Sequence, residues 1–403
     1  MQRKAHMNNT ERTDTNQEAF FELVRAGLWE KKVLLSEFNN IDYEAIMEMA
    51  EEQSVVGLVT AGMEHIDVRG QKEVVRCKPS QEMMLQFVGE TLQIEQQNKD
   101  MNEFVAWLID LLRKADVCAI LLKGQGIAQC YERPLWRASG DVDLLLSDSN
   151  YEKAKKVLLP LATEVETEYT HFKHQGMTIN GFVVELHGTQ HSRLSRRVDR
   201  MIDEVQKDVF YGGNVRSWQN GNTQVLLSGV NDDVIFVFTH ILHHFFFEGI
   251  GLRQICDWCR LLWTYRDSLD YRLLESRLRK AGLMTEWKAF AAFAVDWLGM
   301  PVKAMPLYDE NDRSAMPLGS SKNQNEKLKR KAERIKDFVL EVGNFGHKQR
   351  RDYSGQPYLL RKIKSSFGRF SDMLRHFSIF PKDSIVFFGG VLRSGLYAAV
   401  RGE

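Results

Sequence analysis

The spacing of hydrophobic residues predicts helices over most of the first 115 residues. From Ser80 onward, apolar side chains recur every three or four positions along SQEMMLQFVGETLQIEQQNKDMNEFVAWLIDLLRKAD, which is the period of one helix face. Ser80 suits the N-cap, and Arg113 with Lys114 suits the negative end of the helix dipole. We therefore expect a polar, disordered lead over residues 1–17 and a helical region over residues 18–116.

The pattern then changes to that of strands. VCAILLKG and DVDLLL are short apolar runs of strand length, and the first of them ends in glycine. A short helix, IAQCYER, is expected between them, and an amphipathic helix capped by Asn150 or Ser149 is expected after the second. EVETEYTHFKHQ and MTINGFVVELHG predict two more strands, joined by a turn at Gln175–Gly176. This alternation indicates an α/β unit at residues 117–230.

Helical spacing returns at residue 231, and no further strong strand signal follows. The expected helices cover residues 231–247, 251–266, 268–281 and 285–299. A polar linker is predicted at residues 309–334, between a helical region at 231–308 and a C-terminal helical region at 335–403. The chain is thus expected to hold a small α/β unit between two helical regions.

Composition narrows the class of protein. The chain has 403 residues, 43% hydrophobic and 27% charged, which indicates a globular protein of two or three packed units. Lys+Arg and Asp+Glu number 54 each, so no whole-chain field attracts nucleic acid or membrane. The basic run KLKRKAER is interpreted as a solvated helix face, so no nucleic-acid patch is assigned.

The cysteines and the apolar segments bear on the cellular compartment in which the protein is expected. The five cysteines are odd in number and scattered over a long chain, which favours a reducing environment over disulfides or a structural zinc site. The polar N-terminus lacks the apolar core of a signal peptide, and the longest apolar stretches are interrupted by polar residues and are too short to span a bilayer. We therefore expect a cytoplasmic protein without a membrane span. The sequence leaves its oligomeric state open.

Two carboxylates stand out within the second predicted strand, in the stretch SGDVDLLL. Asp141 and Asp143 are two residues apart and therefore point to the same face, whereas Val142 points to the other. Paired carboxylates suit a hard divalent cation, and Gly140 before them permits close approach of a backbone or a phosphate. An isolated pair at this spacing is also typical of a solvated strand.

Neighbouring residues favour the metal interpretation. Lys123 and Gly124 end the preceding strand and could cradle a phosphate, and Arg133 and Arg137 could bind phosphate oxygens. Glu185 lies inside an apolar strand, where a carboxylate is costly to bury unless it is paired or bound to metal.

Histidines supply weaker candidates. His187 shares the strand face of Glu185 and is a candidate for the same site. His240, His243 and His244 share one helical face, which is compatible with zinc; hydrogen-bonded packing histidines are the alternative.

These residues resemble a known family. The pattern LLKG, ERPLWRASGDVDLLL and VVELH is similar to a largely uncharacterised bacterial family within the DNA polymerase β-like nucleotidyltransferase superfamily. The downstream HILHHFFFEGIGLRQICDWCRLL looks like the helical part of that family, and the resemblance covers roughly residues 100–300. It implies an α+β fold in which a small mixed-sheet nucleotidyltransferase core is embedded between helical regions.

The resemblance also implies roles for individual residues. Asp141 and Asp143 would bind Mg²⁺ (or Mn²⁺) and the nucleotide triphosphate, and Glu185 would be the third acid, able to bind metal or take a proton. Gly124 would face the phosphates. The superfamily usually has a small hydroxyl residue after this glycine, whereas this chain has Gln125. Residues that could take over phosphate binding are Lys123, Arg137 and Ser139.

Helical region 231–308 would form the other wall of the cleft, with His187, Arg253 and Asp257 as possible substrate contacts. Arg253 and Asp257, four residues apart, could instead pair with each other.

Three functions compete at this point. The leading one is metal-dependent transfer of a nucleoside monophosphate from an NTP, with ATP expected, to a hydroxyl of a small molecule or macromolecule, releasing pyrophosphate. A catalytically silent nucleotide-binding regulatory protein of the same fold is the alternative. A small-molecule kinase ranks below both, because the sequence has no Gly-rich P-loop and no HRD-like loop.

Overall fold

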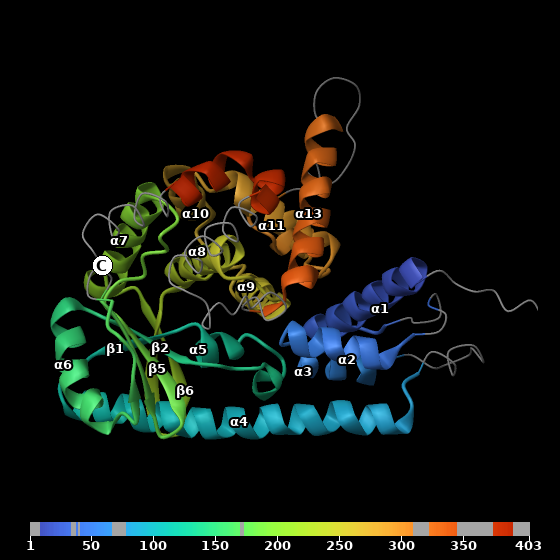
Figure 1. Ribbon diagram of the computed structural model, residues 1–403. Coiled ribbons are helices and arrows are strands. Elements are labelled where there is room, and N and C mark those ends of the chain that lie inside the picture. The colour runs from blue at the N-terminus through green and yellow to red at the C-terminus, as the bar shows by residue number, and fades with distance from the viewer. Residues whose placement is uncertain are drawn as a thin grey trace, which may run out of the picture.

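The computed structural model describes residues 9–33, 38, 41–66, 78–169, 173–308, 322–344 and 374–389. Within these ranges, a seven-stranded mixed sheet is flanked by helices that precede it in the sequence and by helices that follow it (Figure 1). The expected α+β architecture, with a mixed-sheet core between helical regions, is confirmed. No helix among the described residues is long and apolar enough to cross a membrane.

The N-terminal part is a cluster of three short helices against one long helix. Their bounds are α1 Asn9–Trp29, α2 Tyr43–Glu52, α3 Val56–Glu64 and α4 Gln81–Lys114. Ser80 caps α4 as expected, because its Oγ accepts a hydrogen bond from the Met83 amide at 3.1 Å. Figure 1 shows α4 running below α2 and α3 at one end and below the sheet at the other.

Helix α1 corrects the predicted lead at residues 1–17, since it begins at Asn9. Its apolar segment from Ala19 to Leu28 is buried and packs against α3, and the helix continues N-terminally from that anchored segment. The packing is close enough to require glycine. A Cβ on Gly62 would lie 2.1 Å from the Leu23 carbonyl oxygen, far inside van der Waals contact.

The sheet has the strand order β3-β4-β5-β2-β1-β7-β6. The strands are β1 Ala119–Leu122, β2 Val142–Leu146, β3 Glu164–Val165, β4 His174–Ile179, β5 Phe182–His187, β6 Val215–Asn220 and β7 Thr223–Ser228. The pairs β2/β5 and β1/β7 are parallel, and the other neighbouring pairs are antiparallel. The second parallel pair was not expected, because β6 and β7 alternate polar and apolar residues too weakly to stand out.

Side-chain alternation divides the sheet into two packed faces. Leu121, Leu144 and Leu186 face α4 and α6 (Asp148–Leu158), with which they form one apolar cluster. Leu122 and Leu145 belong to the other cluster, which extends into the helices on the opposite side. Asp143, next to Leu144 in β2, points toward those helices and not toward α4.

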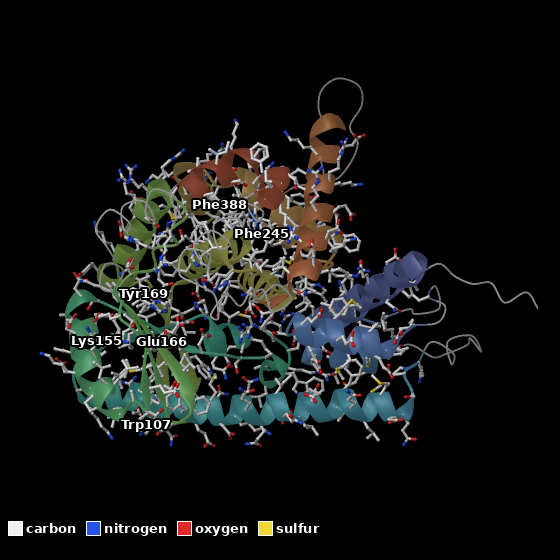
Figure 2. All side chains as sticks on the ribbon, in the orientation of Figure 1. Trp107, Lys155, Glu166, Tyr169, Phe245 and Phe388 are labelled. Carbon is white, nitrogen blue, oxygen red and sulfur yellow. The ribbon has the colours of Figure 1, made fainter. Side chains whose placement is uncertain are left out.

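The helices on that opposite side form a large aromatic core. They are α5 Gly124–Ala128, α7 Arg196–Tyr211, α8 Val230–Phe247, α9 Leu252–Thr264, α10 Tyr271–Ala281, α11 Met284–Asp296 and α13 Lys322–Val342, with helical turns at 374–379 and 381–389. Phe245 of α8 contacts the rings of Phe290, Phe338 and Phe380, and Figure 2 shows Phe245 and Phe388 in this part. Three short 3₁₀ helices complete the described elements: Pro134–Trp136, Leu159–Leu161 and Val302–Ala304.

The predicted turn at Gln175–Gly176 is wrong. Both residues lie inside β4, and the hairpin turns at Asn180–Gly181, whose φ angles are +49° and +81°. Asn-Gly is the preferred pair for a two-residue hairpin because both residues tolerate positive φ. Of the predicted first strand, Glu164–Val165 form β3, and its last two residues, His174 and Gln175, belong to β4.

Two other boundaries differ from the predictions. Helix α6 begins at Asp148 after Ser147, so neither Asn150 nor Ser149 occupies the cap position. Part of the predicted linker 309–334 is helix α13, which packs against α11. Its buried residues Leu328, Ala332, Ile335 and Val339 recur at helical spacing, so the basic residues between them belong to an amphipathic helix.

The close contact at Gly62 gives a stability prediction. Gly62→Ala should lower the free energy of unfolding by about 1–3 kcal/mol, because the added Cβ forces α1 and α3 apart. Urea unfolding followed by circular dichroism measures the change. Gly89→Ala in α4 is the matched control: its Cβ meets no atom within 4 Å, so helix propensity should raise stability by up to about 1 kcal/mol. Equal effects of the two substitutions would contradict the packing argument.

Candidate active site

Three carboxylates meet where β2 and β5 lie side by side. Asp143 and Glu185 are paired in the parallel register of the two strands, and Asp141 precedes β2 by one residue. One oxygen from each of the three carboxylates lies within 4.8 Å of the others. The structure therefore brings together the three acids that the sequence singled out. It does so because strand register places them on one face of the sheet.

Lys123 enters this group from the end of β1. Leu122 pairs with Asp143 across the antiparallel β1/β2 ladder, so the next residue, Lys123, reaches the carboxylate, and its Nζ lies 3.1 Å from Asp143 Oδ2. The backbone turns sharply here, since Lys123 and Gly124 have φ angles of +51° and +40°. Positive φ is strained for lysine, and such strain persists only where the surroundings fix it.

The charges in this group do not balance. The negative charge of Asp143, together with burial, raises the pKa of Asp141. Burial acts to lower the pKa of Lys123, but the charges of Asp143, Asp141 and Glu185 outweigh it, and that pKa is raised. One lysine therefore faces three carboxylates, an excess of negative charge that favours cations.

Two histidines flank Glu185. His187 Nε2 lies 2.8 Å from Asp143 Oδ1 and 3.3 Å from Glu185 Oε2, and His174 Nε2 lies 3.2 Å from the same Glu185 oxygen. Burial opposes protonation of His187, but its hydrogen bonds to the two carboxylates raise its pKa to about 9. Burial likewise opposes ionisation of Glu185, but the hydrogen bonds from His174 and His187 hold its pKa below the usual range.

His174 was missed by the sequence analysis, although a signal for it exists. With the turn at Asn180–Gly181, each residue of β4 has a fixed partner in β5, and His174 is the partner of His187. The Asn-Gly pair alone would have placed the two imidazoles opposite each other.

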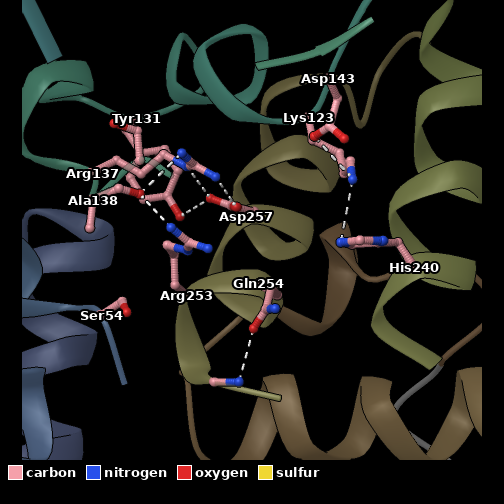
Figure 3. A network of polar contacts seen from close by, with 12 residues as sticks. Ser54, Lys123, Tyr131, Arg137, Ala138, Asp143, His240, Arg253, Gln254 and Asp257 are labelled. Atoms are coloured by element: carbon pink, nitrogen blue, oxygen red, sulfur yellow. Dashed lines mark hydrogen bonds and ion pairs between the residues drawn. The ribbon is translucent and has the colours of Figure 1, made fainter. Parts of the chain in front are cut away.

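Arg137 and Asp257 form a buried ion pair that joins the sheet to α9 (Figure 3). Arg137 donates from Nε to Asp257 Oδ1 at 2.8 Å and from an Nη to Oδ2 at 2.6 Å, and Tyr131 donates its hydroxyl to Oδ1 at 2.8 Å. Arg253 donates to the Ala138 carbonyl at 3.0 Å, while Asp257 receives its two parallel hydrogen bonds from Arg137.

These contacts bear on the phosphate-binding candidates. The guanidinium of Arg137 donates its hydrogen bonds to Asp257 and to the Ala138 carbonyl. These contacts indicate that Arg137 positions the segment before β2. Arg133 pairs with Glu30 and Glu64 of the N-terminal part instead of facing the carboxylates.

Asn98 of α4, which the sequence analysis did not single out, holds the same segment from the other side. Its amide donates to the Leu135 and Arg137 carbonyls at 2.8 Å, and its Oδ1 accepts from the Ser139 hydroxyl at 2.7 Å. Ser139 is thus held away from a free phosphate-binding position. A Cβ on Gly140 would meet no atom within 4 Å, so the expected room for a ligand is present there.

Helix α8 supplies the opposite wall with histidines. His240 Nε2 lies 3.5 Å from Lys123 Nζ and 2.9 Å from His244 Nε2, and His244 Nδ1 lies 3.0 Å from Glu248 Oε2. Burial and then the Lys123 charge hold the pKa of His240 well below normal, and burial lowers the pKa of His244. Hydrogen bonding thus accounts for these histidines.

A cavity of about 370 Å³ lies between the sheet and the α8/α9 wall. It is lined by all three carboxylates, by Lys123, Gly124 and Gly140 and by residues of the helices, among them His240 and Arg253. This volume is within the range of small-molecule sites, and the lining is more polar than is usual for them.

Comparison with known proteins gives one match. A family model described as an uncharacterised nucleotidyltransferase matches residues 39–299. No curated protein and no solved structure matches the chain. The matched residues run from the N-terminal helices through the sheet to the end of α11, and they include every residue that lines the cavity.

The buried ion pair gives a prediction that does not depend on ligand. Asp257→Asn should destabilise the fold by about 3–5 kcal/mol, because it leaves the buried Arg137 charge without its partner. Urea unfolding measures the loss. Glu275→Gln, which breaks an exposed pair with Arg279, is the control and should cost at most about 1 kcal/mol. A similar loss in the two variants would show that the Arg137–Asp257 pair does not join the halves of the site.

Proposed function

The chain belongs to the uncharacterised nucleotidyltransferase family, and we propose that it transfers a nucleoside monophosphate from an NTP, with ATP as the expected donor, to a hydroxyl acceptor. The observation that carries the proposal is the convergence of Asp141, Asp143 and Glu185 at a cavity of about 370 Å³. Family membership supports nucleotidyl transfer in general, and the acid cluster supports a metal-dependent form of it.

The residues fit a hard divalent cation. Three carboxylate oxygens lie within 4.8 Å of one another, and Lys123 and His187 beside them compensate their charge only in part. Asp141, Asp143 and Glu185 would hold Mg²⁺ or Mn²⁺, which when bound neutralises charge on the triphosphate and on the departing pyrophosphate.

The chain's own groups have distinct tasks in this proposal. Lys123 stays protonated beside Asp143 and offers its ammonium to phosphate oxygens, and Gly124 and Gly140 leave room for the phosphates to approach the backbone. Arg253 lines the cavity and adds positive charge on the side of α9. Arg137, Asp257 and Ser139 act through position, since their polar groups hold the segment that leads into β2.

The proposed reaction is a displacement at the α-phosphorus. The acceptor oxygen forms a bond to this phosphorus, the bond to the bridging oxygen breaks, and pyrophosphate leaves with the electron pair. In the proposal the hydroxyl proton passes to a carboxylate of this cluster, with Glu185 as the candidate acceptor. His187 hydrogen-bonds both Asp143 and Glu185 and so orients the acids for this step.

The helical region beyond the sheet would contact the acceptor. Its cavity-facing groups include hydrogen-bonding side chains such as His240 and Arg253 and the apolar side chains of Phe236, Val237 and Ile241. An acceptor with polar groups can meet the hydrogen-bonding part of this lining.

Substitution of the acids tests the assignment. Asp141→Asn and Asp143→Asn should each reduce pyrophosphate release from ATP and Mg²⁺ by about 100-fold or more, because charge that stabilises the transferring group is lost. A pyrophosphate assay in the presence of a small-molecule extract supplies the acceptor, and calorimetry measures nucleotide binding.

Asp148→Asn is the matched control, because Asp148 follows the same strand but is exposed and pairs with Lys173. It should leave release and binding unchanged. Undiminished release by Asp141→Asn and Asp143→Asn would refute the proposal. Tight Mg²⁺-dependent ATP binding by the unsubstituted protein, with no pyrophosphate under any acceptor mixture, would instead identify the silent regulatory protein.

A further inference from the structure

A second set of metal-binding donors lies next to the three carboxylates. The geometry points to a site in which His174, Glu185 and His187 bind a divalent transition-metal ion of the Zn²⁺ or Co²⁺ type, distinct from the hard-cation site and sharing only Glu185 with it. The site goes beyond the proposed nucleotidyl transfer and does not depend on it.

Strand register fixes the three donors. His187 is two residues after Glu185 on β5, so both side chains point to one face, and His174 on β4 is the direct cross-strand partner of His187. The Asn180–Gly181 turn sets this register. The donors are therefore held by the backbone of a regular hairpin.

The distances match those within one coordination shell. Two donors bound to a common ion at about 2.1 Å, at right to tetrahedral angles, are about 3.0–3.4 Å apart. Both imidazole Nε2 atoms approach the same Glu185 oxygen at such distances, 3.2 Å for His174 and 3.3 Å for His187. The three ligand atoms all lie within 4.8 Å of one another.

The donor types select the class of ion. Two imidazoles and one carboxylate suit Zn²⁺, Co²⁺ or Fe²⁺, whereas Mg²⁺ prefers oxygen donors alone. Three protein ligands leave coordination positions open, and all three side chains line the cavity, so an ion has an entry path and a face toward a ligand there.

A metal ion bound at the histidine site would affect the neighbouring hard-cation site. His187 Nε2 lies 2.8 Å from Asp143 Oδ1, and the same nitrogen cannot both donate to Asp143 and bind an ion. An ion at the histidine site would therefore release Asp143 Oδ1 for the hard-cation site. This coupling, unlike the site itself, rests on the proposed function.

Cobalt titration of the full chain tests the site. One equivalent of Co²⁺ should bind with the visible ligand-field absorption of a nitrogen-ligated ion, and Zn²⁺ should displace it. His174→Gln and Glu185→Gln should weaken Co²⁺ binding more than the roughly 10–100-fold that loss of an outer-shell partner costs, since a direct ligand is lost. Circular dichroism checks that both variants remain folded.

A matched control makes the result specific. His191→Gln removes a histidine that also lines the cavity but pairs with Asp203. This variant should bind Co²⁺ as the unsubstituted protein does. Absence of stoichiometric Co²⁺ binding, or unchanged affinity in folded His174→Gln, would overturn the inference.

Nucleotide binding separates this inference from the proposed function. Co²⁺ binding that requires His174, in a protein that binds no Mg²⁺–ATP, would support the histidine site and count against nucleotidyl transfer. Mg²⁺–ATP binding that requires Asp141, without a His174-dependent Co²⁺ site, would leave the transfer standing and refute the second site.

Discussion

The crowding of three carboxylates at the end of two neighbouring strands is the constraint to which the rest of this site responds. Two unit charges 4.8 Å apart repel by about 3–4 kcal/mol at an effective dielectric constant near 20, and three pairs share this space. Each adjacent strand contributes a compensating group: Lys123 from β1, His187 from β5 itself and His174 from β4. In the proposed function a bound cation adds to this compensation, so the crowding that costs stability also favours cation binding.

The placement of these acids depends on contacts with residues that are far away in the sequence. The segment before β2 is fixed by Asn98 from α4 on one side and by Asp257 and Arg253 from α9 on the other. A buried ion pair such as Arg137–Asp257 contributes little net stability compared with apolar packing, because both charges lose their hydration. In this structure the ion pair orients the segment before β2. Two parallel hydrogen bonds fix the angle at which the chain enters the acidic strand, and the position of Asp141 follows from that angle.

Local periodicity was sufficient to predict the groups that share a strand or a helix face. The period of two placed Asp141 and Asp143 together, and the period of 3.6 located the helices that became α4, α8, α9, α10 and α11. Partners in different elements were not predictable in this way. The pairing of Arg137 with Asp257 spans 120 residues, and no local pattern distinguishes it from phosphate binding or from a pair with Arg253. His174 was missed for a narrower reason, since an incorrect turn moved the strand register, and a shift in register changes every cross-strand neighbour.

The division of the cavity between sheet and helices explains why chemistry is easier to infer than substrate. The sheet side carries charged groups whose type and spacing limit the reactions they can support. The α8 side carries His240 and His244, whose pKa values are lowered by burial and by the nearby Lys123 charge, together with the apolar side chains of Phe236, Val237 and Ile241. A ligand without a polar group to match the imidazoles leaves buried donors and acceptors unpaired, which costs binding free energy. In the proposed reaction, changes in α8 should therefore alter which acceptor is used while the acids of β2 and β5 keep the reaction the same.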